Sequence, residues 1–167
     1  ASVWLDAQDI DGDGDITDQS NGDSISTWVD KSGNGHDAVA LSANANSQAT
    51  VDADGLNGRP TVRFNPNGGA DRYDIADSLS IEPQTYSMFV VTERLSSAQW
   101  GNTILGKGGE NGIGWQLRQR GNDVNAYTLT ARGTSGDDEP AASGINGVAL
   151  IGAGYDGTDR YLDADGV

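Results

Sequence analysis

The pattern of apolar and polar positions changes every few residues along this chain, and turn-forming residues separate one patterned stretch from the next. The strongest stretch is Tyr86 to Glu93, YSMFVVTE, whose nearly continuous apolar run predicts a strand buried on both faces. Pro60 to Phe64 and Trp115 to Leu117 alternate apolar with polar residues, which predicts half-buried strands. Weaker strand candidates lie at 1–8, 25–29, 39–51, 104–106, 126–131, 147–153 and 160–162.

No stretch carries apolar residues at helical spacing over several turns, and the strand candidates are separated by turn signals such as GLNG at 55–58. This arrangement is typical of an all-β, antiparallel sandwich or barrel that is rich in loops. Neither an internal repeat nor an interdomain linker interrupts it, so we expect a single domain over residues 1–167. Trp4, Trp28 and Trp115 lie in apolar strand candidates and are expected in the core.

Composition narrows the range of functions. The chain has 167 residues with a formal charge of -15, and that charge repels nucleic acids and anionic membranes. It has no Cys and one His, which excludes a disulfide framework, a thiolate metal site and a multi-histidine zinc site. No apolar run approaches the ~18 residues that a membrane span needs, so we expect no membrane insertion. No signal peptide is visible, and the chain begins as though it had been processed or excised from a longer protein.

The acidic residues are unusual in kind, because 21 are Asp and only 4 are Glu. Asp is a poorer helix former than Glu and favours turns, where it occurs here together with Gly and Asn. Carboxylate oxygens are also the ligands that calcium prefers. Nine of the Asp residues lie within residues 1–37, where Lys31 is the only Lys or Arg, so the excess is concentrated around the loop at 9–24.

That loop begins with the pattern D-x-D-x-D-G, which is the first half of a calcium-binding loop of the EF-hand type. Alternate carboxylates converge on one point when the chain coils tightly, and glycine permits the bend. The apolar residue at the eighth position, Ile16, is expected to anchor the loop to the core. The predicted calcium ligands are Asp9, Asp11, Asp13, Asp15 and Asp18.

The second half of the loop departs from that pattern, because Ser20 stands where a bidentate Glu is expected. Asp18, Asp23 or an Asp from elsewhere is left to complete the coordination, and the alternative is a solvated Asp/Gly turn without an ion. Five carboxylates within ten residues repel one another without a cation, which favours the ion. A second acidic group, Asp137, Asp138 and Glu139, is left open between an ion site and a solvated loop.

Several segments together resemble the concanavalin A-like, LamG-type jelly-roll modules of large bacterial secreted proteins. The resemblance covers nearly the whole chain, and no single motif decides it. The segments are VWLDAQDIDGDGDITD at 3–18, STWVDKSGNGHDAVA at 26–40, GLNGRPTVRFN at 55–65, YSMFVVTE, ILGKGG and GYDGTDRYLDADGV, in the expected order. It implies a jelly-roll β-sandwich in an extracellular surface or secreted protein.

Modules of that kind usually continue past the final D-G hairpin with closing strands, whereas this chain stops at Val167. We consider three explanations: a truncated domain, a different closure, or a split domain whose remaining strands follow an inserted domain. A missing strand leaves an exposed sheet edge, so neighbouring domains of the parent protein are expected partners.

Catalysis is not expected. The four Glu residues are scattered, so the paired carboxylates of a retaining glycosidase, about 5–5.5 Å apart, are not indicated. His36 lies in the turn SGNGHD, where a surface or hydrogen-bonded role fits better than that of a catalytic base. GKGG at 106–109 lacks the spacing and the Ser or Thr of a phosphate-binding loop.

Two kinds of ligand fit a non-catalytic module of this composition. For carbohydrate, Trp100 in the polar segment SSAQWGN is the candidate stacking residue, and Arg118 and Arg132 are candidate contacts on a concave face. Packing of Trp100 on a strand end and ion pairs of the two Arg residues are the alternatives. A peptide- or protein-binding calcium-dependent adhesin module also fits, because such modules are rich in Asp, poor in Lys and free of Cys. The third possibility is a purely structural scaffold.

Overall fold

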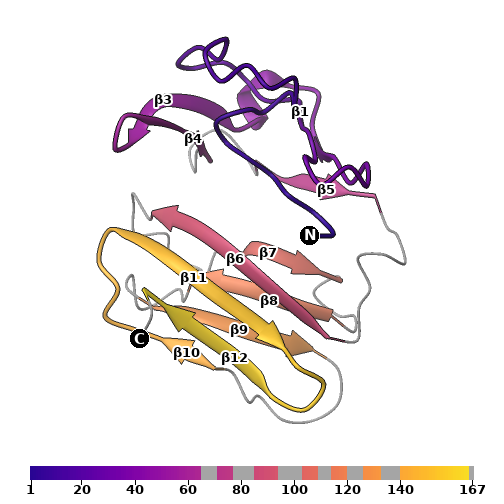
Figure 1. The fold of residues 1–167 in the computed structure, drawn as a ribbon, viewed down its shortest axis with the longest axis vertical. Coiled ribbons are helices and arrows are strands. Elements are labelled where there is room, and N and C mark those ends of the chain that lie inside the picture. Colours follow the sequence, from indigo (N-terminus) through magenta and orange to yellow (C-terminus); the bar gives the residue numbers. More distant parts are fainter. Residues whose placement is uncertain are drawn as a thin grey trace. The chain divides into compact units, whose positions relative to one another are not determined.

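The computed structural model describes residues 1–64, 71–76, 85–93, 103–108, 114–119, 126–132 and 140–165 (Figure 1). Apart from one short 3-10 helix, Ala45–Ser47, the regular structure in these residues consists of antiparallel strands. Contacts divide the chain into two compact units, Ala1–Glu82 and Pro83–Val167, and each is described separately below. Within the described residues, no helix has the length and apolarity needed to cross a membrane.

The first unit contains two small sheets. The strands β1, β2 and β5 form one sheet in that order, and β3 pairs with β4 in a hairpin. Asn57 (φ 52°) and Gly58 (φ 71°) connect the hairpin, and two successive positive φ angles are typical of a type I′ turn. The turn predicted at 55–58 is therefore confirmed. The bounds are Thr27–Trp28 (β1), Ala38–Ala40 (β2), Thr50–Leu56 (β3), Arg59–Arg63 (β4) and Tyr73–Ile75 (β5).

The core of the first unit consists of the buried residues Ile10, Ile25 and Val51. The partly buried side chains of Trp28, Val62 and Tyr73 pack against them. The Tyr73 hydroxyl donates to the carbonyl oxygen of Ile25 and accepts from the Ala49 N–H at 3.2 Å. Ile10 belongs to the acidic loop, so the loop is anchored directly in this core.

The second unit contains two larger sheets, of order β12-β11-β6 and β10-β9-β8-β7. Its buried residues come from strands of both sheets, so its core lies between them (Figure 1). Leu117, Leu129 and Ile151 are its largest fully buried side chains, and the rings of Tyr86 and Trp115 stack with centroids 4.9 Å apart. The bounds are Tyr86–Glu93 (β6), Thr103–Lys107 (β7), Gly114–Gln119 (β8), Tyr127–Arg132 (β9), Ala141–Ala142 (β10), Val148–Tyr155 (β11) and Arg160–Ala164 (β12).

The prediction that β6 is buried on both faces is wrong. Met88 and Val90 face the core of the second unit, whereas Phe89 and Val91 are 79% and 59% exposed. Because successive strand residues point to opposite faces, an apolar run does not by itself show that both faces are covered. The strand predicted at 1–8 is reduced to an isolated bridge between Leu5 and Asp30, and β5 and β10 were not expected.

The all-β, antiparallel class is confirmed. The described strands form four separate small sheets, so a jelly-roll sandwich is not shown. A single domain over residues 1–167, lacking its closing strands or split, stays a prediction.

We predict that Ile151→Ala lowers the free energy of unfolding by about 2–5 kcal/mol, because the substitution leaves a cavity between the two sheets. The neighbouring Leu150 faces the other way and is 53% exposed, so Leu150→Ala is a matched control that changes stability by less than about 1 kcal/mol. Urea denaturation of the two variants measures the difference. Equal losses would contradict the placement of the core.

Candidate metal centre

The backbone of the acidic loop is coiled by a ladder of hydrogen bonds in which Asp side chains accept from N–H groups two residues later. Asp11 Oδ1 accepts from the Asp13 N–H at 3.4 Å, and Asp13 Oδ1 accepts from the Asp15 N–H at 2.7 Å. Asp15 Oδ1 accepts from the Thr17 N–H at 2.9 Å. Asp readily makes such turns, and their repetition produces the coil that the sequence pattern predicts.

Glycine is required where the coil meets the core. Gly12 has φ +76°, and a Cβ atom there would lie 2.7 Å from Cγ1 of Val29. Ile10 is buried beside it, and its carbonyl oxygen accepts from the Val29 N–H at 2.8 Å. The prediction that Ile16 anchors the loop is wrong, because Ile16 is 55% exposed and Ile10 fills that role. Ile10 lies between Asp9 and Asp11 in the sequence, so the coiled loop itself contributes a side chain to the core.

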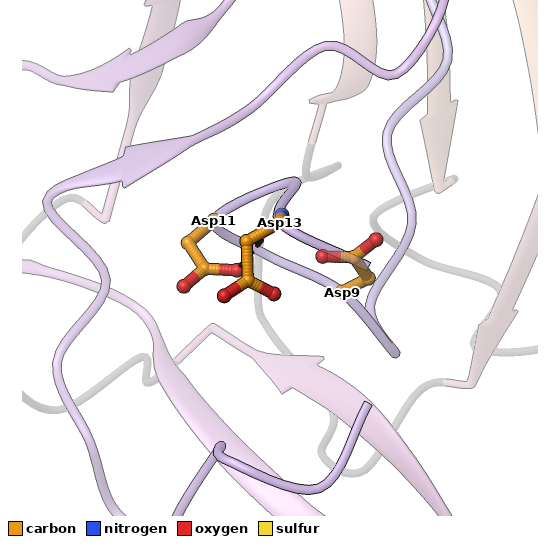
Figure 2. Close-up of side chains that lie close together, drawn as sticks. All are labelled: Asp9, Asp11 and Asp13. Carbon is orange, nitrogen blue, oxygen red and sulfur yellow. Dashed lines mark hydrogen bonds between the residues drawn. The ribbon is translucent and has the colours of Figure 1, made fainter. Parts of the chain in front are cut away.

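Three carboxylates meet on this loop. Asp9, Asp11 and Asp13 each offer a carboxylate oxygen, and the three oxygens lie within 4.8 Å of one another. Asp9 is fully buried, whereas Asp11 and Asp13 are exposed, and Figure 2 shows the carboxylates of Asp11 and Asp13 side by side with Asp9 next to them. Oxygens bound to one Ca²⁺ at about 2.4 Å are at most about 5 Å apart, so the triad has the spacing to hold a metal ion.

The other two predicted ligands, Asp15 and Asp18, lie outside this triad. The Thr17 hydroxyl donates to Asp15 at 2.7 Å, and this bond together with the Thr17 N–H holds the pKa of Asp15 below its usual range. Desolvation raises the pKa of Asp18, and repulsion by Asp11, Asp13 and Asp15 raises it further. Asp18 therefore lies within the field of the cluster, and its role as a ligand stays a prediction.

Lys31, which was not among the predicted site residues, lies against the triad. Its Nζ lies 2.5 Å from Oδ2 of Asp9 and 3.6 Å from Oδ2 of Asp6. The hydrogen bond from Lys31 lowers the pKa of Asp9 against the opposing effect of burial, and it raises the pKa of Lys31 in turn. One feature of the sequence could have indicated this role: Lys31 is the only Lys or Arg among the first 37 residues, where nine Asp residues lie.

A cleft of about 220 Å³ opens next to the triad and shares Asp11 with it. Asp18, Asp23 and Gln19 also line this cleft. The side-chain nitrogen and oxygen of Gln19 are buried and have no hydrogen-bond partner among the residues that the structure describes. Carboxylate and amide oxygens therefore border the space beside Asp11.

Asp30 connects the neighbouring segments through hydrogen bonds. Its buried carboxylate accepts from the N–H groups of Trp4 (2.8 Å), Ser32 (2.9 Å) and His36 (3.0 Å), and from the Ser32 hydroxyl (2.7 Å). Burial opposes its charge, but these hydrogen bonds outweigh that effect and hold the pKa of Asp30 well below its usual range. They explain why Asp30 and Ser32 stand two residues apart in this segment, and they give the backbone of His36 a structural role.

The expectation that both N-terminal Trp residues are core residues is correct only in part. Trp28 is partly buried, and its Nε1 donates to the carbonyl oxygen of Asp6 at 2.9 Å. Trp4 is 52% exposed, and the ammonium of Lys31 lies 5.4 Å from its ring centroid. The strand expected around Trp4 does not form, so its ring lies beside Lys31 instead of between strands.

The candidate ligand-binding residues lie in the second unit or outside the described residues. Trp100 and the acidic group Asp137, Asp138 and Glu139 are outside them. Arg118 in β8 pairs with Thr128 of β9, whereas Arg132 of β9 pairs with Gly114. The two Arg positions are therefore four residues apart along β8, or about 13 Å.

Asp30→Asn should lower the free energy of unfolding at pH 7 by about 1–3 kcal/mol. The substitution turns one carboxylate oxygen into an NH₂ group, which cannot accept the hydrogen bonds that this oxygen accepts. The depressed pKa of Asp30 means that its charge stabilises the folded state above the pKa of the unfolded chain, about 4, and that this contribution is lost as the pH falls further. Denaturation from pH 7 to pH 2 should show a weaker acid dependence in Asp30→Asn. An identical pH profile would contradict this role.

Comparison with known proteins found no protein-family model, no curated protein and no solved structure that matches the chain. The resemblance to LamG-type modules therefore depends on the sequence segments alone.

Proposed function

We propose that this protein is a non-catalytic calcium-binding module of a large extracellular bacterial protein, with the ion held by Asp9, Asp11 and Asp13. The single observation that carries this proposal is the convergence of three carboxylate oxygens to within 4.8 Å on a coiled loop. Hard oxygen ligands of this kind favour Ca²⁺ over the transition metals that prefer nitrogen and sulfur.

The local charge supports a divalent ion. Three carboxylates and the Lys31 ammonium give three negative charges and one positive charge, which leaves -2. Asp18 and Gln19 line the adjoining cleft and are candidates for further oxygen ligands. A bound Ca²⁺ balances the charge of the triad and Lys31, and it reduces the repulsion among Asp11, Asp13, Asp15 and Asp18.

For the ligand of the module we propose carbohydrate. Two sequence features support this choice: Trp100 is a large aromatic residue within a polar segment, and Arg118 lies in β8. An aromatic face and a planar guanidinium are the two groups that sugars commonly require. The alternatives are a peptide- or protein-binding adhesin module and a scaffold in a split jelly-roll domain that holds an inserted domain.

Calcium should raise the melting temperature by about 5–10 °C at a hundredfold excess over Kd, because only the folded chain brings the three carboxylates together. Asp11→Asn combined with Asp13→Asn should abolish most of this rise. Asn keeps a side-chain oxygen for the turns of the loop and removes the charge. Thermal unfolding with calcium and with chelator measures the effect.

The matched control combines Asp54→Asn with Asp163→Asn, two exposed positions outside the loop, and should keep the full response to calcium. The assigned site would be contradicted if the loop variant kept its rise in melting temperature with calcium. It would also be contradicted if the unmodified protein showed no such rise.

For the ligand, a glycan array should show calcium-dependent signals that Trp100→Ala and Arg118→Ala each reduce at least about tenfold, because each removes a principal contact. Arg72→Ala is the control, since Arg72 lies in the first unit, where it pairs with Asp74. Binding to peptides with free carboxyl ends and not to glycans would support the adhesin alternative. If neither glycans nor peptides bind and calcium still raises the melting temperature, the results would support the structural scaffold.

A further inference from the structure

The ammonium of Lys31 is held in place from several sides. Its Nζ contacts Oδ2 of Asp9 at 2.5 Å and lies 3.6 Å from Asp6, and the backbone N–H of Lys31 donates to the Trp4 carbonyl at 2.8 Å. The Trp4 ring lies 5.4 Å from Nζ, within the range of a cation–π interaction. The Lys31 side chain is only 23% exposed, so this charge is less screened than that of a surface lysine.

Lys31 occupies one oxygen of the Asp9 carboxylate, whereas the other oxygen faces the loop. Oδ1 of Asp9 accepts from the Gly14 N–H at 3.3 Å, next to Asp13. An ion held by the triad therefore shares the Asp9 carboxylate with a fixed positive charge. Two cations on the two oxygens of one carboxylate repel each other, and the repulsion grows with the charge of the ion.

We propose that Lys31 sets the affinity and the valence preference of the calcium site by keeping a permanent positive charge on Asp9. This inference depends on the proposed function, because it concerns the same site. With Lys31 the triad carries a net charge of -2, which suits a divalent ion; without it the charge is -3. Lys31 is thus a positioning residue that also limits how tightly cations bind.

Removal of the charge gives two effects in the same direction. The repulsion of the bound ion disappears, and the metal-free state is left with a buried, unpaired Asp9. Both effects make calcium binding more favourable relative to the metal-free protein. A trivalent ion gains more than Ca²⁺, because its interaction with the lysine charge is larger by half. If Lys31 only holds Asp9 in place, its removal weakens binding of both ions.

The experiment measures Ca²⁺ and Tb³⁺ binding to the unmodified chain and to Lys31→Met by calorimetry. We expect Lys31→Met to bind Ca²⁺ at least about fivefold more tightly and to raise the Tb³⁺/Ca²⁺ affinity ratio at least about twofold. Lys31→Arg keeps the charge and should change neither value by more than about twofold. Arg72→Gln removes an exposed charge from the same unit and is the second control.

Lys31→Met is expected to need calcium for folding, and a fold that appears on addition of calcium supports the proposal. If it does not fold at any calcium concentration, Lys31→Gln, which keeps an N–H donor beside Asp9, replaces it with the same expectations. Calcium binding to the unmodified chain with unchanged or weaker binding to the neutral variants would overturn the role of Lys31 and leave the calcium site standing. Absence of calcium binding to the unmodified chain would overturn the proposed function itself.

Discussion

The arrangement of the N-terminal half depends on a buried carboxylate, that of Asp30, which is satisfied by hydrogen bonds from Trp4, Ser32 and His36. A buried charge without such partners is too costly to retain, so these bonds determine the path of three segments at once. One consequence is that Lys31, the next residue, is bonded to the Trp4 carbonyl and directed at Asp9. The candidate metal centre therefore rests on a structural carboxylate that is not itself a ligand.

The acidic loop shows how one short segment combines two roles. Its Asp side chains accept from N–H groups two residues along, which coils the chain, and the same carboxylates converge on one point. Ile10, between two of these Asp residues, enters the core and links the loop to β3 through Val51. The geometry of the triad is thereby coupled to the packing of the first unit, and this coupling is why we expect a bound ion to stabilise the fold.

In the second unit, buried and exposed residues alternate along the strands. Its core is formed by alternate residues of strands in two sheets, and the outward residues of β6 and β11 include Phe89, Val91 and Leu150, which are more than half exposed. Exposed apolar positions on paired strands are a feature that soluble modules usually cover with another element.

The sequence by itself determined the all-β class, the hairpin turn at Asn57 and Gly58, most strand positions and the triad on the acidic loop, because each depends on residues that are close in the chain. It did not reveal that Ile10, and not Ile16, is the anchor, or that Trp4 is exposed beneath Lys31. Nor did it place Lys31 on Asp9, 22 residues away. These features follow from contacts between distant segments, which tertiary packing decides: local spacing shows which side chains share a turn, but only the closed fold shows which face is buried and which charges meet.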